Sequence, residues 1–187
     1  VPNNEFITTN NLLFNQSLRI EPSQFIKRDS LPLTKMQRFV TKFSSISNLK
    51  LSNKLSGNTA NFDFFNFNTA DTSLIAYNKA INTSLFFNRA NPKYDFSFIH
   101  VNQGVKNNQI NGFEERENID NEWKVRYNFF KNTDFFLSIN NGEKNFNNKL
   151  FEDRNFQIDY EKYNAEVSFR YNTKLRISGK YSYGNSQ

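Results

Sequence analysis

Alternation of apolar and polar side chains is the sequence feature that most constrains the fold of this chain. In residues 123–129 every odd position is aromatic or β-branched and every even position is polar. The same period of two returns in residues 164–172 and 174–183. A period of two is typical of a β-strand whose two faces meet different surroundings. The short link at residues 172–174 predicts that the last two segments form an antiparallel hairpin.

Composition extends this prediction to the whole chain. Aromatic residues make up 17% of the sequence, with 22 Phe and 8 Tyr, which favours strands over helices and argues against a disordered chain. Weaker alternation in other segments, residues 62–67 among them, raises the expected number of strands to about ten to twelve. Turn signals such as residues 102–104 and Asn141-Gly142 separate these segments. The sequence therefore predicts an all-β antiparallel meander.

Two architectures use strands with one apolar and one polar face. An outer-membrane β-barrel shows one face to lipid and the other to a wet lumen, whereas a β-sandwich buries one face in a core. The best segments are about as long as membrane strands, carry aromatics near their ends, and place full charges in mid-strand. We therefore expect an outer-membrane β-barrel or part of one. A soluble secreted β-sandwich that binds a protein or glycan through its loops is the alternative.

Strand parity assigns side chains to the two faces of this expected barrel. The residues expected to face lipid are Trp123, Val125, Tyr127, Phe129, Val167, Phe169, Tyr171, Leu175, Ile177, Tyr181 and Tyr183. The charges expected to face the lumen are Lys124, Arg126, Glu166, Arg170, Arg176 and Lys180. Unopposed rings of Arg and Lys would favour anions, whereas pairing with acidic residues would close the lumen and leave a scaffold.

Charge is distributed unevenly along the chain. Up to Ser56 there are eight Lys and Arg against three Asp and Glu, out of a net charge of +6 for all 187 residues. We divide the chain into an N-terminal strand with a basic loop segment (residues 1–36) and the barrel strands (37–187). The basic third is suited to phosphates of lipid headgroups or to a solvated surface. Nucleic-acid binding is a further hypothesis, outside the leading interpretation, and predicts steep salt dependence.

The sequence offers little chemistry for catalysis. It has no Cys and one His, so thiolate sites and His-His metal pairs are excluded. The one His, His100, is expected at the end of a strand, as an interface or loop residue. The acidic residues Glu114, Glu115, Glu117, Asp120 and Glu122 lack the order of a calcium loop and are expected to form a solvated loop. We expect no catalytic residue, no metal and no cofactor, and therefore no enzyme.

The alternating strands, the Asn-rich turns, residues 82–94 and the following Gly112-Phe113-Glu114-Glu115-Arg116 resemble large outer-membrane β-barrel proteins of Bacteroidota-type bacteria. The resemblance implies location in a bacterial outer membrane and a structural, transport or complex-scaffold role. It also implies lipid and other outer-membrane or periplasmic subunits as partners. The family's barrels end on an aromatic residue, whereas this sequence ends at Gly184-Asn185-Ser186-Gln187, so we expect a segment of a longer barrel.

Overall fold

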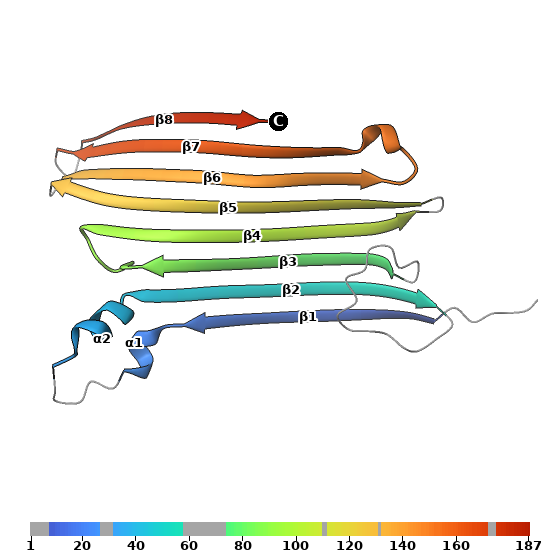
Figure 1. Ribbon diagram of the computed structural model, residues 1–187, viewed down its shortest axis with the longest axis horizontal. Helices are drawn as coiled ribbons and strands as arrows, with labels where there is room; N and C mark the ends of the chain where they lie inside the picture. The colour runs from blue at the N-terminus through green and yellow to red at the C-terminus, as the bar shows by residue number, and fades with distance from the viewer. Residues whose placement is uncertain (1–7, 27–31, 58–73, 110–111, 131, 172–174) are drawn as a thin grey trace, which may run out of the picture.

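One antiparallel sheet contains all the strands of the described residues. A computed structural model describes residues 8–26, 32–57, 74–109, 112–130, 132–171 and 175–187. Each strand pairs with the next along the chain, so that β1 and β8 lie at opposite edges and are not paired with each other. The strands are β1 (Thr8–Ile20), β2 (Phe43–Gly57), β3 (Leu74–Phe87), β4 (Tyr94–Gln109), β5 (Gly112–Phe130), β6 (Thr133–Asn148), β7 (Phe156–Arg170) and β8 (Arg176–Ser186). This meander confirms the predicted all-β antiparallel class (Figure 1).

The described residues form eight strands, fewer than the ten to twelve expected. The expected turns at residues 102–104 and at Asn141-Gly142 lie inside β4 and β6. Neighbouring strands hold these residues from both sides: Gly142, for example, is the register partner of Asp120 on β5 and of Tyr160 on β7. Pairing across the sheet thus overrides the local turn preference of Asn and Gly. The strand expected at residues 62–67 lies outside the described residues.

Short helices occupy two of the connections. Helices α1 (Pro22–Phe25) and α2 (Lys35–Val40) join β1 to β2, and the 3-10 helix η1 (Glu152–Arg154) joins β6 to β7. Figure 1 places α1 and α2 at one end of the sheet, the helix end, and η1 at the other, the η1 end. A capping box starts α2, where Gln37 N–H donates to Thr34 Oγ1 at 3.2 Å and Thr34 N–H donates to Gln37 Oε1 at 2.9 Å.

None of the helices within the described ranges has the length and apolar character needed to cross a membrane. The sheet also lacks a second layer among these residues, because every strand belongs to the same sheet. Their only buried apolar side chains are Leu51, Leu55 and Tyr77, on β2 and β3. A β-sandwich would bury one face of every strand against a second sheet. The described part of the chain therefore does not form the sandwich that was the alternative.

Gly142 is needed for close packing between β5, β6 and β7. A Cβ at this position would overlap the Ile119 carbonyl oxygen and lie 2.5 Å from the Tyr160 hydroxyl, which donates to Asp120 Oδ1 at 3.1 Å. We expect Gly142→Ala to lower the free energy of unfolding by about 1–3 kcal/mol, because the backbone oxygen cannot rotate away. Urea unfolding of the folded protein measures this change. Gly179→Ala is the matched control, since a Cβ there meets nothing within 4 Å; equal losses for both variants would contradict the packing argument.

Candidate functional site: the two faces of the sheet

The strand register defines two faces. Trp123 is the register partner of Phe98 on β4 and of Ile139 on β6, and its ring centroid lies 4.1 Å from that of Phe98. We call the side of the sheet that carries Trp123 face A and the side that carries Lys124 face B. Successive register partners form a row across the sheet, and the row through Trp123 continues to Tyr163 on β7 and Tyr183 on β8. The rings of these two tyrosines are stacked, with their centroids 6.5 Å apart.

The structure brings the eleven residues predicted to face lipid together on face A. The register pairs Phe169 with Ile177, and Tyr171 N–H donates to Leu175 O at 3.1 Å, as the predicted hairpin requires. The turn expected at residues 172–174 lies outside the described residues. The six predicted luminal charges share face B, where the register pairs Glu166 with Lys180 and Arg170 with Arg176.

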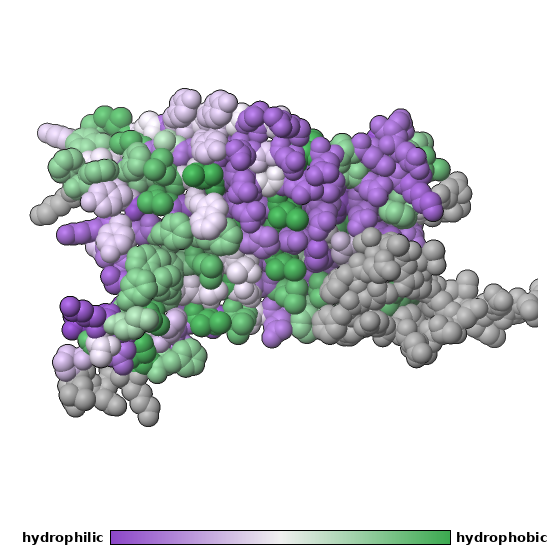
Figure 2. All heavy atoms as spheres, in the orientation of Figure 1, coloured by the Kyte–Doolittle hydropathy of each residue, from purple (hydrophilic) through white to green (hydrophobic). Residues whose placement is uncertain are grey.

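Face A carries an apolar band that extends well beyond the predicted residues. Sequence reasoning missed most of it, because β1–β4 and β6 alternate with less contrast than β5, β7 and β8. Figure 2 looks onto this face and shows apolar side chains gathered toward the helix end, with polar side chains covering β4–β8 toward the η1 end. The residues that extend the predicted set are Leu12, Phe14, Leu18, Ile20, Phe43, Leu49, Leu51, Ile81, Leu85, Phe87, Tyr94, Phe96, Phe98, Phe135, Leu137, Ile139 and Tyr163.

The apolar band crosses the strands obliquely. Its centre on β1 is Gln16, midway between Leu12 and Ile20, and its centre on β8 is Gly179, midway between Leu175 and Tyr183. The register row of Gln16 passes through Asn102 on β4 and reaches Gln187, which exchanges two backbone hydrogen bonds with Asp159, each of 3.0 Å.

Gln187 lies eight positions beyond Gly179 in the sequence, and β1 and β8 are separated by seven strand-to-strand steps. The centre of the band therefore shifts by about 26 Å along the strands, at about 3.3 Å per residue. Over the same seven steps it moves about 34 Å across the sheet, at about 4.8 Å per strand. The band therefore makes an angle of about 38° with the perpendicular to the strands. With β8 uppermost and the helix end at the left, it descends from upper left to lower right (Figure 2).

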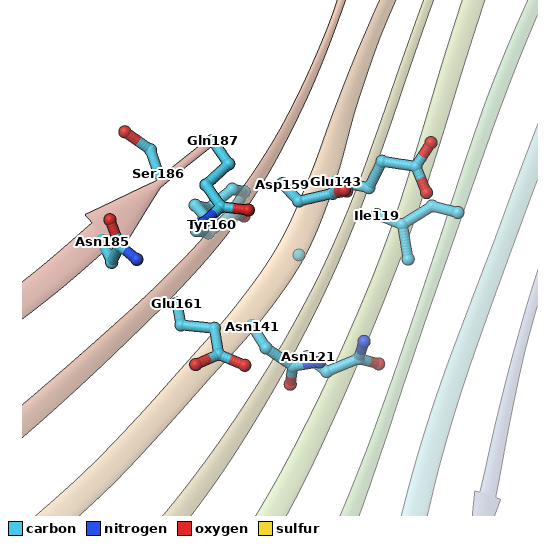
Figure 3. A pocket seen from close by; sticks show the side chains of 11 residues that line it. Ile119, Asn121, Asn141, Glu143, Asp159, Tyr160, Glu161, Asn185, Ser186 and Gln187 are labelled. Carbon is cyan, nitrogen blue, oxygen red and sulfur yellow. The ribbon is translucent and has the colours of Figure 1, made fainter.

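The polar half of face A holds a shallow hollow of about 520 Å³ near the end of β8. Glu143, Asp159 and Glu161 line it together with Asn121 and Asn141 (Figure 3). Figure 3 shows the Glu143 and Glu161 carboxylates directed apart. Within the described ranges, no group of three or more His, Asp or Glu side chains is arranged to hold a metal ion. This hollow is therefore a polar surface without a metal-binding arrangement.

Face B holds a second hollow, of about 590 Å³, lined by both signs of charge. Arg126 forms an ion pair with Asp95, with Nε donating to Oδ2 at 2.6 Å, and Arg126 also donates to Asn91 O at 2.9 Å. Lys124 pairs with Glu122 at 2.6 Å. The cationic side chains that line the hollow are Lys124, Arg126, Lys162 and Lys180, and the anionic ones are Asp95, Glu122 and Glu166. The predicted luminal charges are thus partly neutralised by neighbours on face B.

Uncharged polar side chains continue this surface across β6, β7 and β8. Asn164 donates to Ser138 Oγ at 3.0 Å and accepts from Ser182 Oγ at 2.9 Å. At the helix end, Arg176 Nε donates to Ser168 Oγ at 2.6 Å. Face B is therefore a hydrogen-bonded polar surface near the helix end, where face A is apolar.

Two features of the acidic and histidine side chains differ from expectation. The acidic cluster Glu114–Glu122, expected in a solvated loop, lies within β5, where cross-strand pairing holds it in extended form. Glu117 pairs with Lys79 on β3 at 3.0 Å. His100 lies inside β4 and not at a strand end, and its Nδ1 is 2.8 Å from Asn121 Oδ1.

Comparison with known proteins supports the fold and goes no further. No protein-family model matches the sequence, and no curated protein matches it. Among solved structures, the chain is similar to OmpTdeltaL8 (loop L8 deletion mutant of OmpT), an outer membrane protein of Vibrio cholerae. The TM-score is 0.52 at 11% sequence identity, over 78% of this chain and 45% of that chain. The resemblance to an outer-membrane β-barrel fold is supported, whereas the narrower Bacteroidota-type resemblance stays a prediction.

Proposed function

We propose that this sheet is part of an outer-membrane β-barrel, with face A against lipid and face B toward the lumen. The slope of the apolar band carries this proposal. Strands of transmembrane barrels are tilted by about 35–45° from the barrel axis, so a band level with the membrane makes that same angle with the perpendicular to the strands. The band on face A makes an angle of about 38° with that perpendicular. The direction of its slope, seen from face A, is the one that the outer surface of a barrel shows when its strands coil around the axis in the right-handed sense.

The dimensions of the band support the same assignment. On β7 it runs from Tyr163 to Tyr171, nine residues, which is the length that a tilted strand needs to cross the hydrocarbon layer. On β5 it has Trp123 at one end and Phe129 at the other, where aromatic side chains favour the membrane interfaces. The polar half of face A on β4–β8 would then project out of the membrane at the η1 end.

The role that we propose is structural or transport-related, with no catalysis. The ion pairs of Arg126 with Asp95 and of Lys124 with Glu122 lower the net charge of the luminal surface. A lumen with such internal pairs selects anions less strongly than one with unopposed Arg and Lys rings. The pairs therefore favour a scaffold, or a channel with weak charge selectivity, over an anion-selective pore.

The partners that we propose are lipid on face A and further strands at the sheet edges. The outer edges of β1 and β8 carry backbone groups that cannot face hydrocarbon unpaired. Additional strands, from a longer chain or from another subunit of an outer-membrane assembly, would satisfy them. A bacterial outer membrane is the location that follows.

Membrane fractionation with a heat-shift gel tests this function. We expect the native protein in the outer-membrane fraction and a change in its mobility on a denaturing gel between unboiled and boiled samples, because folded barrels resist detergent. Recovery in the soluble fraction, with identical mobility before and after boiling, would contradict a membrane barrel.

A further inference from the structure

An aromatic cluster joins α2 to the border of the apolar band. The Phe39 ring on α2 lies 5.3 Å from that of Phe43 and 5.8 Å from that of Phe87, and Phe43 lies 4.9 Å from Phe87. Phe43 and Phe87 are register partners on β2 and β3 and belong to the apolar band. The helix is therefore fixed on the face A side of the sheet, at the helix end (Figure 1).

Helix α2 and the residues after it have two unlike sides. Met36 and Phe39 are 69% and 50% exposed, and with Val40 they follow the i, i+3, i+4 spacing of one helix side. The cationic residues Lys35 and Arg38 follow the i, i+3 spacing within α2, and Lys42 lies in the turn that follows the helix. Because Phe39 contacts Phe43 and Phe87, this apolar side continues the apolar band of face A, and contiguous exposed apolar surfaces mark sites of protein or membrane contact.

The cations of this segment have no acidic neighbours along the chain. The sequence contains no Asp or Glu from residue 30 to residue 62. Among the described residues, Arg38 Nε donates to the Leu33 carbonyl at 3.0 Å, and Lys42 Nζ lies 5.9 Å from the centroid of the Phe87 ring. Their charges are therefore available to an external anion.

We infer that residues 33–43 form a docking surface for the headgroups of anionic phospholipids. The inference depends on the proposed membrane location and adds a lipid class and a binding segment to it. Met36 and Phe39 would enter the boundary of the hydrocarbon, next to the apolar band, while Lys35, Arg38 and Lys42 extend to the phosphates. Continuity with the band favours a lipid surface over nucleic acid, because a nucleic acid would leave the apolar side uncovered.

Site-specific fluorescence tests this docking. The chain has no Cys, so Met36→Cys in the full-length protein provides a single thiol for a polarity-sensitive fluorophore. We expect brominated acyl chains to quench the label in vesicles that mix phosphatidylcholine with phosphatidylglycerol, while iodide in the water quenches it weakly. Asp153→Cys in η1, at the opposite end of the sheet, is the control and should show the reverse pattern.

Removal of charge tests the choice of lipid. In the labelled protein, Lys35→Gln/Arg38→Gln/Lys42→Gln should lower the ratio of docked to undocked label at least about tenfold in the anionic vesicles, since each cation near an anionic surface contributes about fivefold. The control Lys50→Gln/Lys54→Gln/Lys144→Gln removes three charges from face B and should leave the ratio unchanged.

The remaining outcomes separate this inference from the proposed function. Equal docking in pure phosphatidylcholine, or no effect of the first triple variant, would overturn the anionic-lipid inference alone. A label quenched by iodide in a protein that still shows the heat-dependent gel shift would also overturn it and leave the barrel intact. Loss of the heat-dependent shift in the unsubstituted protein would overturn both.

Discussion

Leu137→Arg should make folding into a bilayer less favourable by about 2–4 kcal/mol, which corresponds to a loss of about 30-fold to 1000-fold in the folding equilibrium. Leu137 lies on β6 in the middle of the apolar band and is 42% exposed, beside Val125 on β5 and Ala165 on β7. If lipid covers this position, an Arg there must be moved into hydrocarbon. Urea titration of folding into vesicles, followed by the unboiled gel band, measures the cost.

Asn141→Arg is the matched control for this substitution. Asn141 lies on the same face of β6, four residues from Leu137, but in the polar half of face A beside Asn121 and Glu161. At that depth an Arg is solvated, and we expect a cost of about 0–1 kcal/mol. Equal costs at the two positions would contradict the placement of the membrane along the apolar band. A cost within about 0.5 kcal/mol at Leu137 would contradict lipid contact, because that is the usual effect of a surface substitution.

The faces of β5, β7 and β8 could be predicted from the sequence because the alternation there is uninterrupted. A side-chain period of two depends only on the local backbone, so Trp123 and Lys124 had to lie on opposite faces once the segment was a strand. The hairpin of β7 and β8 followed from the short link at residues 172–174, and the register pair of Phe169 with Ile177 agrees with it. Both predictions depend on residues that are close together in the sequence.

The number and length of the strands could not be predicted in the same way. Asn141-Gly142 has the local preference of a hairpin turn, but it lies in the middle of a 16-residue strand. Cross-strand partners on both sides hold Gly142 extended, and the Tyr160 side chain lies against the space that a Cβ would occupy. The acidic residues of β5 were misassigned for the same reason, because Lys79, the partner of Glu117, is 38 positions away in the sequence.

The slope of the apolar band could not be predicted from the sequence. It depends on the register of all eight strands, since Gln16 and Gly179 become comparable only when each pair is aligned. Because of this slope, the sheet is a candidate for part of the wall of a barrel with tilted strands. It also predicts that residues of the same register row lie at different depths in the membrane.

Leu18 and Asn185 give the sharpest test of that slope. Both lie on face A and in one register row, which runs from Leu18 on β1 through His100 on β4 to Asn185 on β8. If the strands are tilted, a label at Leu18→Cys lies in the hydrocarbon and a label at Asn185→Cys lies in water. We expect brominated acyl chains to quench the first strongly and the second little, with the reverse order for iodide.

Strands that stand upright in the membrane would place both labels at one depth, and equal quenching would contradict the tilted arrangement. Labels at Phe14→Cys and Ile177→Cys complete the comparison. Each lies two residues from the centre of the band on its own strand, but their register rows differ widely, since Phe14 pairs with Leu51 and Ile177 pairs with Phe169. Similar strong quenching of these two labels is expected only if the membrane follows the slope of the apolar band, because the register alone would separate them along the strands.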